Sequence, residues 1–126
     1  MLELGYELGV TPDLWAGTDA IARLPEAVCE EYFAHQGPTP VHIDNKRAYH
    51  RFFMRGKAVL KRDEARLGVY TKDLSRQGLC FLSPVQLFPL ERVTIEMPNG
   101  AEYHLELTRC RRIAESCYEC GTKFVS

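Results

Sequence analysis

The spacing of apolar residues along the chain changes near residue 50. Before that point, five apolar side chains recur three, four or seven positions apart, which is the spacing of one helical face. They are Leu14, Ile21, Leu24, Val28 and Tyr32. Thr11-Pro12 suits a helix start, and a proline such as Pro25 divides a helical segment. The first 40 residues are therefore predicted to form two helices, the second over about residues 25–35.

After residue 50, apolar and polar residues alternate, as in a strand with one buried face. The first such strand places Phe52, Met54, Ala58 and Leu60 opposite Arg55, Lys57 and Lys61. Five further strands are predicted near residues 67–71, 79–82, 93–97, 103–113 and 118–124. Turns at Glu64-Ala65, at Pro84 to Pro89 and at Pro98-Asn99-Gly100 separate several of them. Six short strands joined by turns predict an antiparallel sheet that closes into a barrel or packs as a sandwich.

The size and composition of the chain favour one compact unit. Its 126 residues are 45% hydrophobic and 26% charged, which is ordinary for a soluble globular protein. We expect a helical segment, residues 1–42, docked on a barrel of residues 43–126, because an apolar helical stripe must be covered. Trp15 and Tyr32 are expected to form the core of that docking contact.

Several function classes find no support in the sequence. No apolar run approaches the ~20 residues of a membrane helix, and the acidic start MLELGYELGV lacks the basic residues of a secretory signal. Five cysteines at irregular spacing do not suggest a disulfide framework. We therefore expect a cytoplasmic protein with reduced thiols and no membrane insertion.

Metal binding and catalysis are also not expected. Cys117 and Cys120 lie three residues apart, a spacing that directs them to opposite faces of a strand. No second pair of cysteines or histidines completes a tetrahedral set. The sequence contains no G-x-x-x-x-G-K-[ST] loop for ATP, and no spacing indicates a catalytic triad.

The net charge of −1 conceals a strong asymmetry. Residues 1–45 contain eight acids and one base, whereas residues 46–76 contain ten bases and three acids. A basic block of this kind indicates an anionic partner. A solvated strand face is the alternative explanation for the same charges.

Two short motifs carry the candidate chemistry. The first is an R-x-x-x-R pair directly before the first predicted strand, formed by Arg47 and Arg51 and preceded by Lys46. The second is a D-x-S-x-x-G turn between the second and third strands, formed by Asp73, Ser75 and Gly78. Because a hairpin returns the chain to the side that it left, the two motifs are predicted to meet at one end of the barrel.

This pair of motifs, in this order and spacing, resembles the PilZ family of cyclic di-GMP receptors. The resemblance extends from about residue 46 to residue 126, and includes Gly121 and Phe124 in the last strand. It implies a mainly β fold, a six-stranded antiparallel β-barrel with the N-terminal helices packed on it, and a receptor that is not an enzyme and needs no cofactor. It also implies ligand-binding roles for Arg47, Arg51, Asp73, Ser75 and Gly78, while Lys46 influences whether one ligand or a stacked pair binds.

The chemistry of these residues suits cyclic di-GMP, a dianion with two guanines. An arginine fork binds phosphate oxygens in pairs, stacks on purines and matches the O6 and N7 acceptors of guanine. The carboxylate of Asp73 offers acceptors for the guanine N1–H and N2–H donors. Gly78 is expected to let the ligand approach the backbone or to take a positive φ.

Ligand is expected to order the arginine segment and so change the surface shown to an unidentified protein partner. The regulated process, for example motility or biofilm formation, is left open. One alternative is a PilZ-like interaction module that binds no nucleotide. A second is a small barrel that binds nucleic acid, for which Phe53 and Tyr70 are the candidate stacking residues.

Overall fold

A computed structural model of the chain describes residues 15–24, 32–34, 36–38 and 52–125. The described part contains eight strands. They are β1 (Ala20–Ile21), β2 (Gly37–Pro38), β3 (Phe52–Arg62), β4 (Ala65–Leu74), β5 (Leu79–Ser83), β6 (Arg92–Glu96), β7 (Glu102–Ala114) and β8 (Cys117–Phe124).

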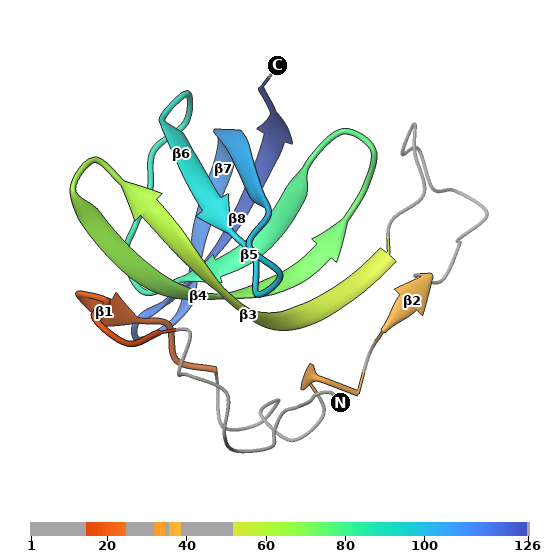
Figure 1. Cartoon of the computed structure of the whole chain (residues 1–126), viewed down its shortest axis with the longest axis horizontal. Helices are drawn as coiled ribbons and strands as arrows, with labels where there is room; N and C mark the ends of the chain where they lie inside the picture. The colour runs from red at the N-terminus through yellow and green to blue at the C-terminus, as the bar shows by residue number, and fades with distance from the viewer. Residues whose placement is uncertain (1–14, 25–31, 35, 39–51, 126) are drawn as a thin grey trace.

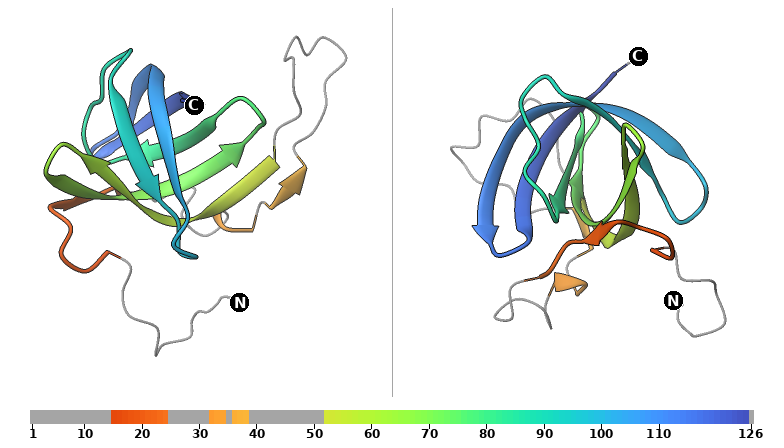
Figure 2. Two further views of the ribbon diagram at one scale, coloured as in Figure 1. Left: turned by 45° about the horizontal axis from the view of Figure 1, so that its top comes forward. Right: turned by 90° about the vertical axis from the view of Figure 1, so that its left-hand side faces the viewer.

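Strands β3 to β8 form a closed antiparallel barrel. Their order around the wall is β3-β4-β5-β8-β7-β6, and β6 pairs again with β3, which closes the ring. Two short strands lie outside this ring: β1 pairs in parallel with β4, and β2 pairs antiparallel with β3 (Figures 1 and 2). The six-stranded antiparallel barrel predicted from the sequence is confirmed.

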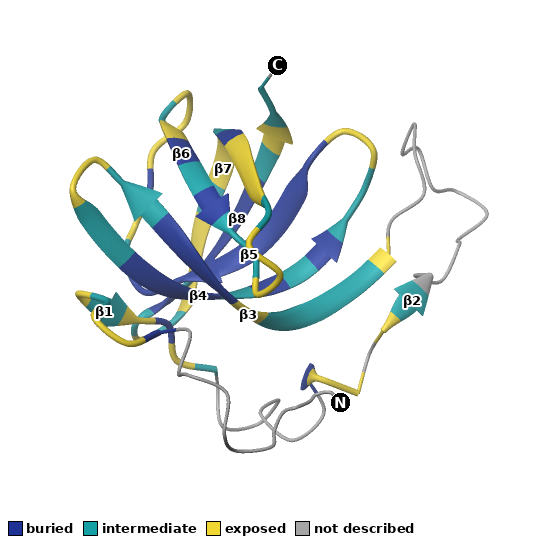
Figure 3. Ribbon diagram, in the orientation of Figure 1, coloured by how far each residue is buried: buried dark blue, intermediate teal, exposed yellow. Residues whose placement is uncertain are grey.

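The interior of the barrel is filled by the apolar residues of the alternating pattern. Buried residues concentrate in the barrel wall (Figure 3). The fully or nearly fully buried core consists of Ala58, Leu60, Leu67, Val69, Leu79, Phe81, Leu87, Val93, Ile95, Leu105, Leu107 and Cys120. Leu87 comes from the loop between β5 and β6, so this loop contributes a core side chain of its own. Every predicted strand therefore supplies at least one residue to a single core.

The two ends of the barrel carry different connections. The corner between β4 and β5 and the turn between β6 and β7 belong to one end, which we call the motif end. The turn between β3 and β4, the β5–β6 loop and the β7–β8 turn belong to the other end. The turn between β3 and β4 consists of Asp63 and Glu64, one residue earlier than predicted, with Asp63 at a φ of 53°.

The first predicted helix is wrong in the residues that the structure describes. Residues 15–17 form a turn, in which Gly17 has a φ of 79°, and β1 follows. The N–H groups of Asp19 and Ala22 donate to the carbonyls of Arg66 and Gly68, at 2.7 and 2.8 Å. Pairing with the neighbouring strand thus satisfies the backbone groups that a helix would satisfy internally. The second predicted helix, residues 25–35, falls mostly outside the described residues.

Among the described N-terminal residues, Trp15 and Tyr32 dock on the barrel. The indole of Trp15 donates to the carbonyl of Ala58 at 2.8 Å, and the hydroxyl of Tyr32 donates to the carbonyl of Thr71 at 2.5 Å. The rings of Trp15 and Tyr32 pack edge-on against Tyr70, at centroid distances of 5.0 and 5.9 Å. The expected docking core of Trp15 and Tyr32 is therefore confirmed.

Candidate functional site

The D-x-S-x-x-G motif forms the corner between β4 and β5 at the motif end. The N–H of Ser75 donates to the carbonyl of Gly78 at 2.9 Å. The Ser75 hydroxyl accepts from the N–H groups of Gln77 and Gly78, at 3.1 and 3.3 Å. Short-range bonds from a serine hydroxyl to nearby amides stabilise turns of this kind. Ser75 therefore has a structural role in shaping the corner, whatever it does toward a ligand.

Gly78 is required by packing against β8. A Cβ atom at this position would lie 1.8 Å from the carbonyl oxygen of Thr122 and 2.8 Å from the Cα of Lys123. Gly78 is absent from the described glycines with positive φ, so that expected reason for a glycine is wrong. The space left by the missing side chain is occupied by the β8 backbone. Gly78 thus brings the corner into contact with the last strand.

Asp73 lies on β4 beside the start of β3. It pairs with Phe53, and Leu74 pairs with Phe52, the residue directly after the R-x-x-x-R motif. Asp73 is only 7% exposed, and a register shift between Thr71 and Asp73 interrupts the β4–β5 ladder. The pairing places the second motif opposite the strand end that follows the first motif. Lys46, Arg47 and Arg51 themselves lie outside the described residues.

Asp73 begins a row of residues that crosses four strands. Asp73 pairs with Cys80, Cys80 with Gly121, and Gly121 with Arg109. Their strand neighbours pack inside the barrel: Leu74, Leu79, Cys120 and Cys110. Because successive residues of a strand point to opposite faces, the row lies on the outer face of the barrel. We call these four residues the outer row.

Glu119 lies on the same outer face, and three basic side chains surround its carboxylate. Its carboxylate forms ion pairs with Lys72 and with Arg111, the latter at 3.0 Å, and Arg109 lies 3.8 Å away. Burial pushes the pKa of Glu119 upward, but the hydrogen bonds and charges of Lys72 and Arg111 outweigh it and hold the pKa below its ordinary value. Sequence spacing does not predict this cluster, because its members come from β4, β7 and β8.

The thiol of Cys80 is held in its neutral form. Burial raises the pKa of Cys80 to about 11, and the charges of Asp73 and Glu119 add to this effect, whereas those of Lys72 and Arg109 oppose it. A thiol that stays protonated is a poor nucleophile. Cys80 is therefore a packing residue of the outer row.

A cavity of about 880 Å³ opens at the motif end. Apolar side chains make up most of its lining, and three residues of the second motif, Leu74, Ser75 and Arg76, belong to it. The lining residues are Phe52, Met54, Leu74, Ser75, Arg76, Leu79, Met97, Pro98, Asn99, Tyr103 and Phe124. Asp73 faces the outer surface and is absent from this lining, so the corner separates an apolar mouth from a polar outer face.

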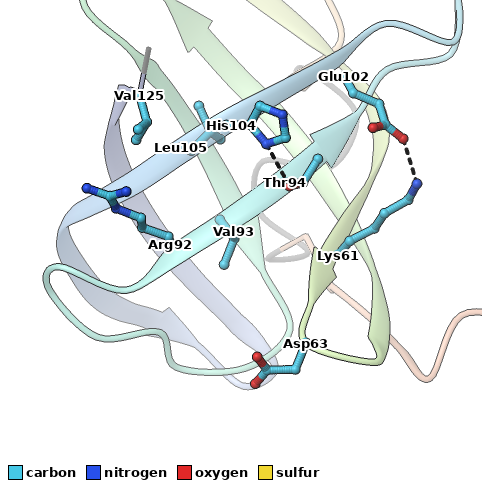
Figure 4. A pocket seen from close by; sticks show the side chains of 9 residues that line it. All are labelled: Lys61, Asp63, Arg92, Val93, Thr94, Glu102, His104, Leu105 and Val125. Atoms are coloured by element: carbon cyan, nitrogen blue, oxygen red, sulfur yellow. Dashed lines mark hydrogen bonds and ion pairs between the residues drawn. The ribbon is translucent and has the colours of Figure 1, made fainter.

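A second pocket, of about 430 Å³, lies over β6 and β7 (Figure 4). Four of its charged and polar side chains are paired with one another. Lys61 Nζ lies 2.6 Å from Glu102 Oε2, and Thr94 Oγ1 lies 3.1 Å from His104 Nδ1. None of its lining residues belongs to either motif, and the pocket does not enlarge the candidate site.

The described residues also bear on metal and membrane binding. Cys117 packs with Tyr32 and Leu82 outside the barrel, whereas Cys120 packs inside it, so the expectation that they point to opposite faces is confirmed. In the part of the chain that the structure describes, no three His, Cys, Asp or Glu residues are grouped to hold a metal ion. The same part contains no helix long and apolar enough to span a membrane.

Comparison with known protein families supports the resemblance of the two motifs to those of the PilZ family. Residues 45–126 match the family model described as the PilZ domain. No curated protein matches the chain. The matched region includes β3 to β8 and both motifs.

Replacement of Gly78 should test its packing role. We expect Gly78→Ala to destabilise the protein by about 2 kcal/mol or more, because the added methyl group meets backbone that cannot rotate away. Gly56→Ala is the matched control, since nothing lies within 4 Å of a Cβ built there and its φ is not positive. Urea unfolding measures both variants. Equal, small effects would contradict the packing explanation.

The charge cluster around Glu119 should make stability depend on pH. A carboxylate whose folded-state pKa is lowered stabilises the protein above its ordinary pKa, near 4.3, and loses that contribution as the pH falls through the folded-state value. We expect Glu119→Gln to flatten the decline in unfolding free energy between about pH 6 and pH 3. The exposed Glu115→Gln serves as the control. An unchanged decline in Glu119→Gln would show that the cluster contributes nothing.

Proposed function

Because the chain belongs to the PilZ domain family, we propose that it binds cyclic di-GMP and acts as a receptor for this second messenger. The family is one of cyclic di-GMP receptors, and its domains bind ligands and do not catalyse reactions. The proposal therefore includes no catalytic residue and no cofactor. Residues 45–126, which match the family, contain all the candidate ligand-binding positions.

The β3–β4 pairing is the observation that carries this proposal. Phe52 and Phe53 follow the arginine motif without a gap, and they pair with Leu74 and Asp73. Had β3 and β4 paired in the opposite sense, the two motifs would belong to opposite ends of the barrel. The observed register supports a shared site built from both motifs.

Each motif has a distinct part in the proposed site. Arg47 and Arg51 bind phosphate oxygens through their guanidinium forks and face the guanine edge or ring. Lys46 adds a further positive charge near the phosphates. Asp73 accepts hydrogen bonds from guanine, and the corner shaped by Ser75 and Gly78 holds Asp73 in position.

The burial of Asp73 supports a ligand-driven rearrangement. A ligand that contacts this carboxylate must reach a group that is only 7% exposed. Binding therefore requires the chain around the outer row to adjust, and we propose that the arginine segment becomes ordered around the ligand. The altered surface then engages a protein partner.

The packing of the aromatic rings argues against the alternative of a nucleic-acid-binding barrel. Tyr70 is one of its two candidate stacking residues, and its ring is in contact with those of Trp15, Tyr32 and Phe33. The other is Phe53, whose ring is covered by the guanidinium of Arg55, with Arg55 Cζ 4.5 Å from the ring centroid. A stacking platform for single strands needs exposed rings.

Calorimetric titration with cyclic di-GMP tests the receptor function directly. We expect the protein to bind, and Arg47→Ala to lose about 2–5 kcal/mol, or roughly 30- to 5,000-fold in affinity, because a charged partner of a desolvated phosphate is removed. Arg92→Ala, at the opposite end of the barrel, should bind as the unmodified protein does. Absence of binding by the unmodified protein would favour the interaction module that recognises no nucleotide.

Amide hydrogen exchange tests the ordering of the arginine segment. We expect residues 43–51 to gain protection when cyclic di-GMP is present, because ligand contacts restrict the backbone of that segment. The β3–β4 turn at Asp63 and Glu64, at the opposite end of the barrel, supplies an internal reference that should not change. Binding without any change in protection at residues 43–51 would remove the proposed switch while leaving the receptor function in place.

A further inference from the structure

The outer row connects the second motif to an arginine that belongs to neither motif. Arg109 lies on β7, three strands away from Asp73 along the row. Adjacent strands are about 4.8 Å apart, so the two ends of the row are roughly 14 Å apart in the sheet. An extended arginine side chain covers part of that distance. The direction in which Arg109 points therefore decides whether it belongs to the candidate site.

The side chain of Arg109 lies across Gly121, toward the motif. A Cβ atom at Gly121 would lie 2.8 Å from Nε of Arg109 and 3.1 Å from both its Cγ and its Cζ. Three atoms along one side chain thus rest on the same glycine. The charge of Arg109 also acts on Cys80, the next residue of the row. Gly121 provides the space that lets the guanidinium extend from β7 toward β5.

Arg109 is the exposed member of the outer row. Asp73 and Cys80 are nearly inaccessible, at 7% and 2% exposure, and Gly121 is buried as well. The side chain of Arg109, by contrast, is 53% exposed. One side of it rests on the glycine and the other faces solvent. A molecule that approaches Asp73 along the outer face therefore meets this guanidinium.

The nearby carboxylate does not account for this arrangement. Arg109 Nη1 lies 3.8 Å from Glu119, whereas Arg111 lies 3.0 Å from the same carboxylate and Lys72 is closer still. Glu119 thus has two nearer cations. An ion pair at 3.8 Å between partly exposed groups contributes little to stability.

We propose that Arg109 is a further ligand-contacting residue of the cyclic di-GMP site and that its guanidinium stacks on a guanine. This inference rests on the proposed receptor function. A guanidinium is planar and weakly hydrated, and it stacks on aromatic rings in a way that a lysine ammonium does not. With Asp73 at one end of the row and Arg109 toward the other, the guanine is contacted by an acceptor and by a planar cation.

Titration of two Arg109 variants with cyclic di-GMP tests this role. We expect both Arg109→Ala and Arg109→Lys to weaken binding by about tenfold or more, because neither retains a planar cation. Arg112→Ala, an exposed arginine on the same strand, should bind as the unmodified protein does. The melting temperatures of all variants should stay close to that of the unmodified protein, since the pairing of Arg109 with Glu119 is weak.

A Gly121→Ala variant provides a second test that leaves the charge unchanged. The added methyl group would meet Arg109 Nε at 2.8 Å, and the flexible side chain would be displaced. We expect weaker cyclic di-GMP binding without a loss of fold.

The outcomes separate this inference from the receptor function. If the unmodified protein binds and Arg109→Ala binds equally well, the inference is overturned and the receptor function stands. If Arg109→Lys retains full affinity, charge alone suffices and the stacking contact is wrong. If Arg112→Ala is weakened as much as Arg109→Ala, the effect is one of general charge and the specific contact is also wrong. If the unmodified protein does not bind, both proposals fail.

Discussion

The pairing of β3 with strands on both of its edges is the constraint on which the remaining structure depends. β3 pairs with β4 along most of its length and with β6 through residues 59–61, and this second pairing closes the barrel. Closure removes the exposed sheet edges and fixes the register of each strand against its neighbours. It is this register that sets Phe52 and Phe53 opposite Leu74 and Asp73. The geometry of the candidate site is thus a consequence of how the barrel closes.

The two faces of the barrel wall differ in their chemistry. Its inner face is a continuous apolar core, and its outer face carries the outer row together with the charge cluster around Glu119. Alternation along each strand makes this division possible, because one residue packs inside while its neighbour faces outward. Cys117 and Cys120 illustrate it within a single strand, since one packs beneath the N-terminal segment and the other in the core.

Two glycines, Gly78 and Gly121, make room for atoms of other residues, a role that their sequence motifs do not reveal. Gly78 belongs to a turn motif, yet its positive-φ explanation fails and the contact with Thr122 explains it. Gly121 belongs to the last strand and accommodates the side chain of Arg109. Both positions were identified from the sequence. The atoms that would clash with a side chain at Gly78 belong to β8, and those at Gly121 belong to Arg109 on β7. Each contact joins two strands, so it depends on how those strands pair and not on the local sequence around the glycine.

The sequence by itself determined the six antiparallel strands, which follow from local periodicity and turn chemistry, and it indicated a docking core of Trp15 and Tyr32. The pattern left a barrel and a sandwich open, and the resemblance of the two motifs implied the barrel that the structure shows. It could not determine the form of residues 15–24, because an apolar spacing suited to a helix was overridden by backbone pairing with β4. Nor could it reveal the outer row. Register shifts between Thr71 and Asp73 and between Leu107 and Arg109 decide which residues become neighbours across strands. Such shifts arise from packing between distant segments, so only the tertiary structure decided them.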